Sequence, residues 1–259
     1  MKVTRPTTRM LVATFGAFAL ITAACGSDDD TADTTPPATA APTTVAAADT
    51  TMAATDTTVP VPVTEPMAMY EGDLVGLFSV NTGTCADGAV VGSYFQMVQP
   101  GGTPEAGPFI ANADSKCTDT NYTLLAVGTD GGLITGSSQA APDPAFDGTG
   151  NGLAAAIVAP VTFFGSAFAA ATDPTEAAPT ITATAGTLSG DLSAFTAYWG
   201  TGIFNQGAPK PDGTGAAPTG TIDPETGVFM IEWTSLIAGG SFDGFTGVWH
   251  LEGTFSAAG

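Results

Sequence analysis

Short stretches of alternating apolar and polar residues, separated by glycine-rich turns, recur between residues 69 and 259. Alternation places successive side chains on opposite faces of a strand, whereas a helix needs apolar residues three and four positions apart. No helical period is sustained in this region, and the 33 glycines of the chain suit frequent tight turns. The pattern predicts an all-β domain over residues 69–259. We expect an antiparallel β-sandwich, with a β-barrel as the alternative, with long glycine-rich loops and at most one short helix.

The clearest local signal is GTIDPETGVFMIEW, residues 220–233. The DPETG sequence at 223–227 is typical of a type I turn that Gly227 closes with a positive φ, so we expect a hairpin. In the strand after the turn, alternation places three apolar side chains on one face: Phe229, Ile231 and Trp233. Met230 and Glu232 lie on the other face.

The C-terminal segment GFTGVWHLEGTF, residues 244–255, has the same alternation. Its apolar face carries Phe245, Trp249, Leu251 and Phe255, and its polar face carries Thr246, His250, Glu252 and Thr254. Antiparallel pairing with the preceding strand brings Glu232 to the face of His250 and Glu252. Two carboxylates beside an imidazole raise its pKa, so these three residues are the candidate catalytic or cation-binding group. Alternation by itself favours the simpler interpretation, an outer face on which they meet water.

Further strands are expected at residues 73–80, 90–98, 122–127, 180–184 and 192–199. An uncharged, alanine-rich stretch at 153–171 has nearly the length of a membrane span. Pro160 and Gly165 interrupt it, and no Lys or Arg flanks it. We therefore expect a short helix over 152–159, capped by Asn151, followed by a buried strand over 161–169.

The first 24 residues have the pattern of a secretory signal peptide. Lys2, Arg5 and Arg9 form a basic region, and an uncharged apolar stretch over 10–24 ends in small residues. Ala23, Ala24, Cys25 and Gly26, but not Thr22, resemble the lipobox of bacterial lipoproteins. The resemblance implies that Cys25 carries diacylglycerol and becomes the mature N-terminus, which would anchor the protein stably. The alternative is an ordinary signal peptide cut after Ala24.

Residues 25–68 form a segment rich in Thr, Ala and Pro, with no aromatic residue and only acidic charges. Such a composition buries too little apolar surface to offset the entropy of ordering. We interpret the segment as a disordered tether that holds the following domain away from the membrane. An O-glycosylated stalk is compatible with the same composition.

The chain has 5 Lys and Arg residues against 25 Asp and Glu, a formal net charge of −20. Nucleic-acid binding needs clustered cations, so this class of function is excluded. The same charge repels anionic lipid headgroups, so attachment to a membrane must be hydrophobic or covalent.

Two cysteines remain once Cys25 is assigned to lipid. Cys85 and Cys117 allow one intramolecular pairing, and an exported compartment permits a disulfide. A metal or redox site is a weaker interpretation, because the chain has no CxxC motif and His250 is its one histidine.

The loop DPAFDGTGNG, residues 143–152, places Asp143, Asp147 and Asn151 in a glycine-rich turn. Calcium favours carboxylate and carbonyl oxygens, so calcium is a candidate cofactor here. The loop lacks the full calcium-loop spacing, and turn chemistry explains the same residues.

Aromatic residues suggest a surface on which sugars stack. Tyr198, Trp199 and Phe204 are the candidates, while Trp233 and Trp249 lie on apolar faces and suit the core. Lys210 lies between two prolines in a loop that suits recognition or, as we favour, plain connection.

Taken together, the lipobox, the acidic tether and a β-rich domain that ends in WHLEGTF resemble uncharacterised actinobacterial lipoproteins. This resemblance implies a location on the outer face of the cytoplasmic membrane and no particular reaction. We therefore expect a membrane-anchored, non-catalytic protein that binds a cell-envelope component or has a structural role there. The alternatives are a lipoprotein that binds a small ligand or divalent cation, and an extracytoplasmic hydrolase that uses Glu232, His250 or Glu252.

Overall fold

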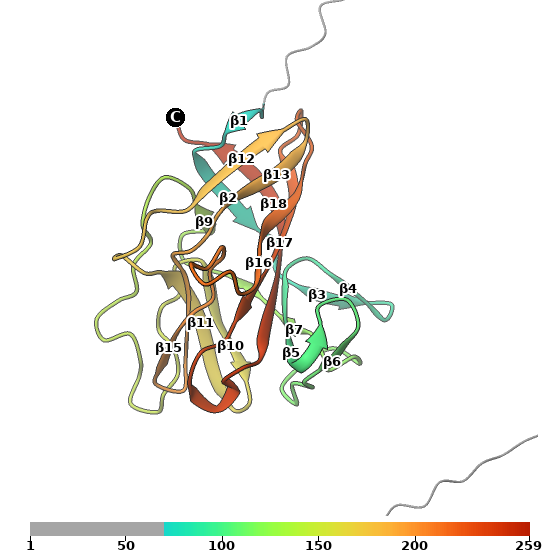
Figure 1. Cartoon of the computed structure of the whole chain (residues 1–259), viewed down its shortest axis with the longest axis vertical. Coiled ribbons are helices and arrows are strands. Elements are labelled where there is room, and N and C mark those ends of the chain that lie inside the picture. The colour runs from blue at the N-terminus through green and yellow to red at the C-terminus, as the bar shows by residue number, and fades with distance from the viewer. Residues whose placement is uncertain (1–69) are drawn as a thin grey trace, which may run out of the picture. The chain divides into compact units, whose positions relative to one another are not determined.

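The computed structural model describes residues 70–259 of the chain (Figure 1). The expected signal peptide, the lipidation of Cys25 and the tether over 25–68 lie outside the described residues. Residues 70–259 form antiparallel β-sheets, and their one helical element is the 3-10 turn η1, Gly240–Phe242. The all-β antiparallel prediction is confirmed.

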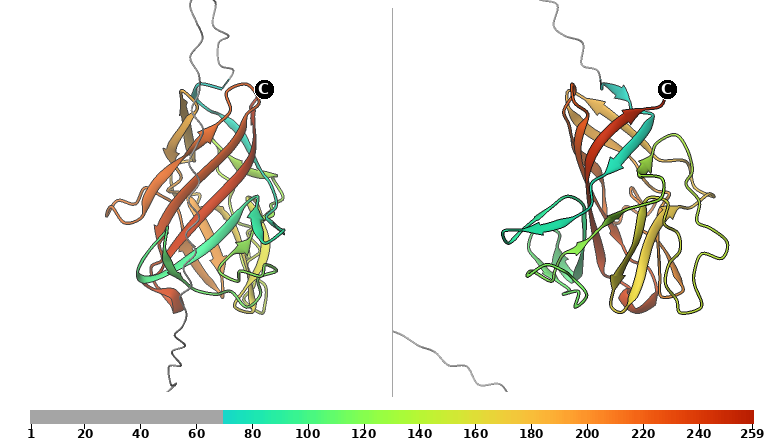
Figure 2. Two further views of the ribbon diagram at one scale, coloured as in Figure 1. Left: turned by 90° about the vertical axis from the view of Figure 1, so that its right-hand side faces the viewer. Right: turned by 180° about the vertical axis from the view of Figure 1, so that it is seen from behind.

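The large sheet contains eleven strands and curls into a half-barrel (Figure 2). Its path runs through β1 (Gly72–Asp73), β12 (Thr180–Thr184), β13 (Thr187–Asp191), β16 (Ala216–Ile222), β17 (Val228–Leu236), β18 (Thr246–Ala257), β2 (Gly76–Val80) and β9 (Gly132–Ile134). The N-terminal part of β18 also pairs with β5 (Tyr94–Thr103), which in turn pairs with β6 (Gly107–Phe109) and β7 (Thr123–Leu124). The long β18 therefore pairs with β17 along one edge and with both β2 and β5 along the other.

A five-stranded sheet packs against the half-barrel. Its strands lie in the order β15 (Gly202–Asn205), β14 (Phe195–Trp199), β11 (Ser166–Thr172), β10 (Val158–Phe163) and β8 (Ala126–Val127). A separate hairpin, formed by β3 (Thr84–Ala86) and β4 (Ala89–Val91), projects beside β5 (Figure 1).

The core lies between the two larger sheets. Trp233 of β17 pairs in register with Trp249 of β18, and their rings stack with planes 9° apart. Phe195 of β14 meets both rings edge to face, at centroid distances of 5.0 and 4.8 Å. Both tryptophans are 1% exposed, which confirms that they are core residues. Each buried aromatic ring contributes a large apolar area, so this cluster helps to hold the two sheets together.

The predicted hairpin at residues 220–233 is present as β16 and β17. The backbone N–H of Gly227 donates to Asp223 O at 2.9 Å, and Gly227 has φ 73°. Asp223 Oδ1 accepts the backbone N–H groups of Glu225 and Thr226, which fixes the turn. Alternation then buries Phe229, as predicted.

The strand predicted over 161–169 is wrong, because a hairpin turn interrupts it. Phe164 and Gly165 both have positive φ, 48° and 77°, and the chain reverses there between β10 and β11. A two-residue turn with two positive φ values matches the right-handed twist of the strands it joins. The same geometry occurs at Asp87–Gly88, Ala185–Gly186 and Gly200–Thr201. A phenylalanine at the first position gives no sequence signal for such a turn.

The helix predicted over 152–159 with Asn151 as its cap is also wrong. The backbone N–H of Ile157 donates to Ala170 O on β11, and that of Leu153 donates to Ala145 O. These bonds to distant segments replace the bonds that a helix would make within itself. Tertiary pairing thus outweighs the helix propensity of the alanine run. No helix within residues 70–259 has the length and apolar character that crossing a membrane requires.

Several predicted strands are divided in the structure. Residues 73–80 form the end of β1 and all of β2, and residues 90–98 are interrupted at Gly92, which has φ 79°. Residues 122–127 are shared between two sheets, because β7 pairs with β5 and β8 pairs with β10. Leu125, between β7 and β8, is fully buried.

Candidate functional site

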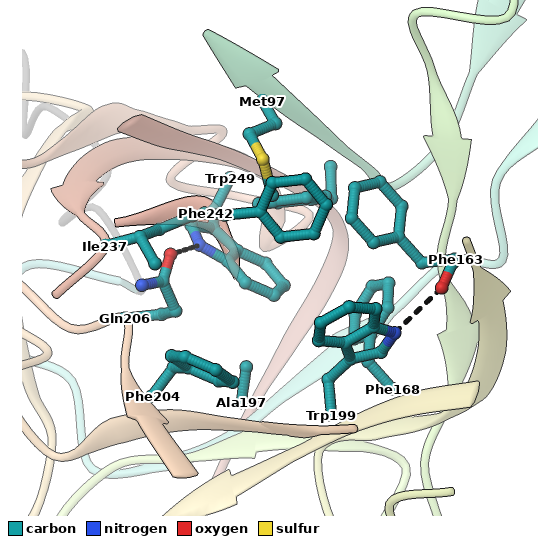
Figure 3. A pocket seen from close by; sticks show the side chains of 11 residues that line it. Met97, Phe163, Phe168, Ala197, Trp199, Phe204, Gln206, Ile237, Phe242 and Trp249 are labelled. Carbon is teal, nitrogen blue, oxygen red and sulfur yellow. Dashed lines mark hydrogen bonds between the residues drawn. The ribbon is translucent and has the colours of Figure 1, made fainter. Parts of the chain in front are cut away.

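An aromatic cavity lies where the five-stranded sheet meets the half-barrel (Figure 3). It has a volume of about 50 Å³. Aromatic rings form most of its wall: Phe95, Phe163, Phe168, Trp199, Phe204, Phe242 and Trp249. Met97, Ala197, Gln206 and Ile237 complete it. We call this space the aromatic cavity.

Strand alternation places these side chains. Phe95 and Met97 point inward from β5, and Ala197 and Trp199 point inward from β14. The small side chain of Ala197 lies in register between Ala170 of β11 and the larger Phe204 of β15. A small side chain at this position leaves space within the aromatic wall.

The polar atoms of the wall are already hydrogen-bonded. Trp199 Nε1 donates to Phe163 O at 2.7 Å, and Trp249 Nε1 donates to Gln206 Oε1 at 3.3 Å (Figure 3). Gln206 Nε2 donates to Asn205 O at 3.2 Å. The aromatic cavity consequently presents ring faces and aliphatic groups to a guest.

Phe242 closes part of the aromatic cavity from the short turn η1. Its ring lies 5.4 Å from that of Trp199 and 5.6 Å from that of Phe163, centroid to centroid. Asp243 Oδ1 accepts the backbone N–H of Gly239 at 2.6 Å and so holds the turn closed. The ring of Phe242 remains partly exposed, so the wall is open to solvent on this side.

The second candidate site is the acid–histidine cluster, formed by Glu232, His250 and Glu252. Antiparallel register pairs Glu232 with His250, as the sequence predicts. His250 Nδ1 lies 2.7 Å from Glu232 Oε1, and His250 Nε2 lies 2.8 Å from Glu252 Oε1. A carboxylate accepts but does not donate, so two such bonds require both ring nitrogens to carry a proton. The cluster therefore holds an imidazolium between two carboxylates.

The expectation that this face simply meets water is wrong for His250, which is 8% exposed. Tyr94 of β5 covers it, with ring planes 7° apart and centroids 4.4 Å apart. Tyr122 packs edge to face on Tyr94 at 5.0 Å. Pairing of β5 with β18 places Tyr94 there, and alternation along a single strand does not reveal that cover.

Burial, hydrogen bonds and charges within the cluster shift three pKa values. Burial by itself lowers the pKa of His250, but the hydrogen bonds and charges of both glutamates outweigh burial and raise it. The hydrogen bond from His250 lowers the pKa of Glu232, although burial opposes this shift. Burial and then the charge of Glu232 raise the pKa of Tyr94 to about 12. The arrangement stabilises charge separation within the cluster and leaves neither ring nitrogen free to accept a proton.

The loop proposed to bind calcium is organised by its own side chains. Asp147 Oδ1 accepts Thr149 N–H, Thr149 Oγ1–H and Asn151 N–H, and its Oδ2 accepts Asn151 Nδ2–H. These bonds lower the pKa of Asp147 well below its usual range, the side-chain bond from Asn151 having the largest effect. Asn151 Oδ1 accepts Ala167 N–H. This geometry favours the turn interpretation, and calcium binding that includes Asp143 stays a prediction.

The other residues that the sequence singled out have structural roles. Cys85 and Cys117 form a disulfide, with Cα atoms 5.6 Å apart. Lys210 Nζ donates to Asn205 O at 2.8 Å and to Asn205 Oδ1 at 2.9 Å, which fastens its loop, and burial lowers its pKa. Tyr198 is buried in a small cluster on the far side of the five-stranded sheet. Across residues 70–259, no group of three or more His, Cys, Asp or Glu side chains is arranged to hold a metal ion.

The sequence singled out Trp199 and Phe204 as binding candidates and assigned Trp249 to the core, but it did not bring the three to one cavity. It missed Phe163 and Phe242, whose segments give no signal of a shared site. Comparison of the chain with protein-family models, curated protein sequences and solved structures gives no match.

Proposed function

We propose that this protein is a non-catalytic binding protein, anchored to the outer face of the cytoplasmic membrane through Cys25, whose binding site is the aromatic cavity. The observation that supports this proposal is a wall of aromatic and aliphatic groups in which the polar atoms of Trp199, Gln206 and Trp249 are bonded to other protein atoms. Sites lined by apolar groups whose polar atoms are already paired accept apolar guests.

The size of the aromatic cavity indicates the class of guest. Its volume of about 50 Å³ is smaller than the ~150 Å³ of an engineered apolar protein cavity that holds benzene. A slender aliphatic chain needs less width than an aromatic ring, and the open side near Phe242 allows the rest of the chain to lie outside. We propose that the aromatic cavity takes the end of an aliphatic chain.

The N-terminal sequence supports the proposed location. A basic region, an apolar stretch and Ala23-Ala24-Cys25-Gly26 precede an acidic tether. Two acyl chains on one cysteine hold a protein stably at a membrane. A tethered domain in that position meets aliphatic compounds that partition into the envelope.

The acid–histidine cluster favours a structural role over hydrolysis. Its three members do come together, as the hydrolase alternative requires. Both nitrogens of His250 are nevertheless bonded to carboxylates, at 2.7 and 2.8 Å. A general base needs a free nitrogen within hydrogen-bond reach of the proton that it removes.

The proposal is tested with xenon, a small apolar probe. The mature chain from residue 25 carries Cys25→Ala so that it has no lipid. Xenon pressure should shift the methyl NMR resonances of Ala197 and Ile237, which line the aromatic cavity. Ala197→Val should abolish the shift at Ile237 because the added methyl groups fill the space.

The matched control is Ile203→Ala. Ile203 lies on the neighbouring strand β15, is 62% exposed and does not line the aromatic cavity. This variant should respond to xenon as the wild type does. Unchanged Ala197 and Ile237 resonances in the wild-type chain would refute the proposed binding site.

A further inference from the structure

A wide cleft is formed by the β3–β4 hairpin, the segment 116–122 and Tyr94 of β5. It has a volume of about 470 Å³, within the ~300–1,000 Å³ that is typical of small-molecule sites. We call it the hairpin cleft. Tyr94 lines this cleft while its neighbour Phe95 lines the aromatic cavity, so the two sites lie on opposite faces of β5.

Covalent and hydrogen bonds hold the segments of the hairpin cleft in place. The disulfide from Cys85 to Cys117 joins the hairpin to the segment 116–122. Ser115 Oγ accepts Cys117 N–H at 3.2 Å and donates to Tyr122 O at 2.6 Å, so it fixes the segment near both ends. The lining is therefore arranged before a ligand arrives, which lowers the entropy cost of binding.

Two tyrosine rings give the hairpin cleft an apolar surface. Tyr122 meets Tyr94 edge to face, with centroids 5.0 Å apart, and Tyr94 lies flat against His250. Both tyrosines line the cleft and are partly exposed. A partly exposed aromatic ring offers a flat apolar surface, which matches the C–H face of a sugar ring.

The polar side chains that line the hairpin cleft include both donors and acceptors. Lys116 only donates, ionised Asp119 only accepts, and the Thr118 hydroxyl does both. Asp119 Oδ1 accepts Asn121 N–H at 3.0 Å, and within residues 70–259 no ion pair joins Lys116 to an acidic side chain. A ligand rich in hydroxyls satisfies all three side chains, because each hydroxyl both donates and accepts.

We propose that the hairpin cleft binds a neutral mono- or disaccharide. In this site Tyr122 packs against the C–H face of a sugar ring, while Lys116 and Asp119 bond to its hydroxyls. Anionic sugars are disfavoured because the chain has a formal net charge of −20 and Lys116 is the one cation that lines the cleft. The inference does not depend on the aromatic cavity, since the two sites share no lining residue.

The experiment adds glucose, galactose, N-acetylglucosamine or cellobiose to the mature chain with Cys25→Ala. At least one of these probes should move the backbone amide NMR resonances of Lys116, Thr118 and Asp119. Lys116→Met should weaken that binding about tenfold, because it removes a hydrogen bond from a charged group. Lys210→Met, which changes the other lysine within residues 70–259, is the control and should leave binding unchanged, because Lys210 does not line the hairpin cleft.

A second pair of variants tests the tyrosine ring. Tyr122→Phe should keep saccharide binding because it retains the ring, whereas Tyr122→Ala should weaken binding about tenfold. The resonances of the core residues Trp233 and Trp249 show whether both variants stay folded.

The outcomes separate this inference from the proposed function. Amide resonances that none of the four saccharides moves would overturn the inference and leave the aromatic cavity as the binding site. Equal affinity of the parent chain, Tyr122→Ala and Lys116→Met would also overturn it, because the sugar would then bind elsewhere. Tighter binding of glucuronate than of glucose would overturn the neutral class of ligand. Absence of the xenon response in a parent chain that binds saccharide would overturn the proposed function alone.

Discussion

The imidazole of His250 lies flat against the ring of Tyr94, with centroids 4.4 Å apart and planes 7° from parallel. This contact joins β18 to β5 on the face opposite the tryptophan core. The acid–histidine cluster is therefore a partly buried group of ion pairs on the half-barrel. It makes the free energy of unfolding depend on pH.

The pH dependence has a definite sign. The pKa of His250 is raised above 6.5 in the folded protein. The protonated histidine therefore adds its full share to the free energy of unfolding below that pH, and this share is lost as pH rises through the folded-state pKa. The pKa of Glu232 is lowered below 4.5, so the stability that its ionised form adds is lost only as pH falls through that lowered pKa. We expect urea unfolding to show greater stability at pH 6 than at pH 9.

His250→Gln should remove this slope and cost about 1 to 3 kcal/mol at pH 6, because the two carboxylates lose their charged partner. Glu225→Gln, at an exposed position in the β16–β17 turn, is the control and should keep the wild-type slope. A wild-type protein that is more stable at pH 9 than at pH 6 would contradict the imidazolium assignment.

Ser235→Ala should raise the free energy of unfolding of the ligand-free protein by about 1 kcal/mol, because it removes a buried hydroxyl that has no partner. Ser93→Ala should lower it by about 1 to 2 kcal/mol, since Ser93 Oγ bonds to the Glu252 backbone. Denaturant unfolding measures both. Equal destabilisation by the two changes would show that Ser235 has a protein or water partner in the folded state.

Replacement of both Cys85 and Cys117 by Ala should lower stability by about 3 to 4 kcal/mol in the chain-entropy account. The bond closes a loop with a sequence separation of 32 residues. Guanidinium unfolding of the double variant and the oxidised wild type gives the difference. A loss below about 1 kcal/mol would mean that this loop is already ordered in the unfolded chain.

Asp147→Ala should lower the melting temperature, because Asp147 accepts four hydrogen bonds within its loop. Asp147→Asn should recover part of the loss, since it keeps one carbonyl acceptor. Differential scanning calorimetry with and without calcium distinguishes the two interpretations of the loop. A wild-type melting temperature that rises with calcium would favour the calcium hypothesis over the turn.

Mass spectrometry of the native N-terminal peptide should find diacylglycerol on Cys25. Cys25→Ala should move the protein from the membrane fraction, because two acyl chains provide the stable attachment. An unmodified N-terminal cysteine on a freely released wild-type chain would contradict the anchor and support an ordinary signal peptide.

Local rules predicted the parts of the fold that depend on a single strand or turn. The DPETG turn, the inward face of Phe229 and the core position of Trp249 all follow from alternation and turn chemistry. The approach of Glu232 to His250 followed from one added assumption, antiparallel pairing of consecutive strands. The helix over 152–159 failed because the alanine run pairs with distant backbone groups, a competition that no local pattern reveals.

By itself, the sequence determined the all-β class, the acidic character, the 220–233 hairpin and the pairing of Cys85 with Cys117, because each depends on period, composition or elimination. The tertiary structure alone decided which face of each strand is exposed to solvent and where a cavity lies. Tyr94 covers His250 only because β5 pairs with β18, although the two residues are 156 positions apart in the chain. The aromatic cavity likewise exists because β5, β10, β11, β14, β15, η1 and β18 each bring a large ring to its wall, and such packing is a property of the assembled sheets.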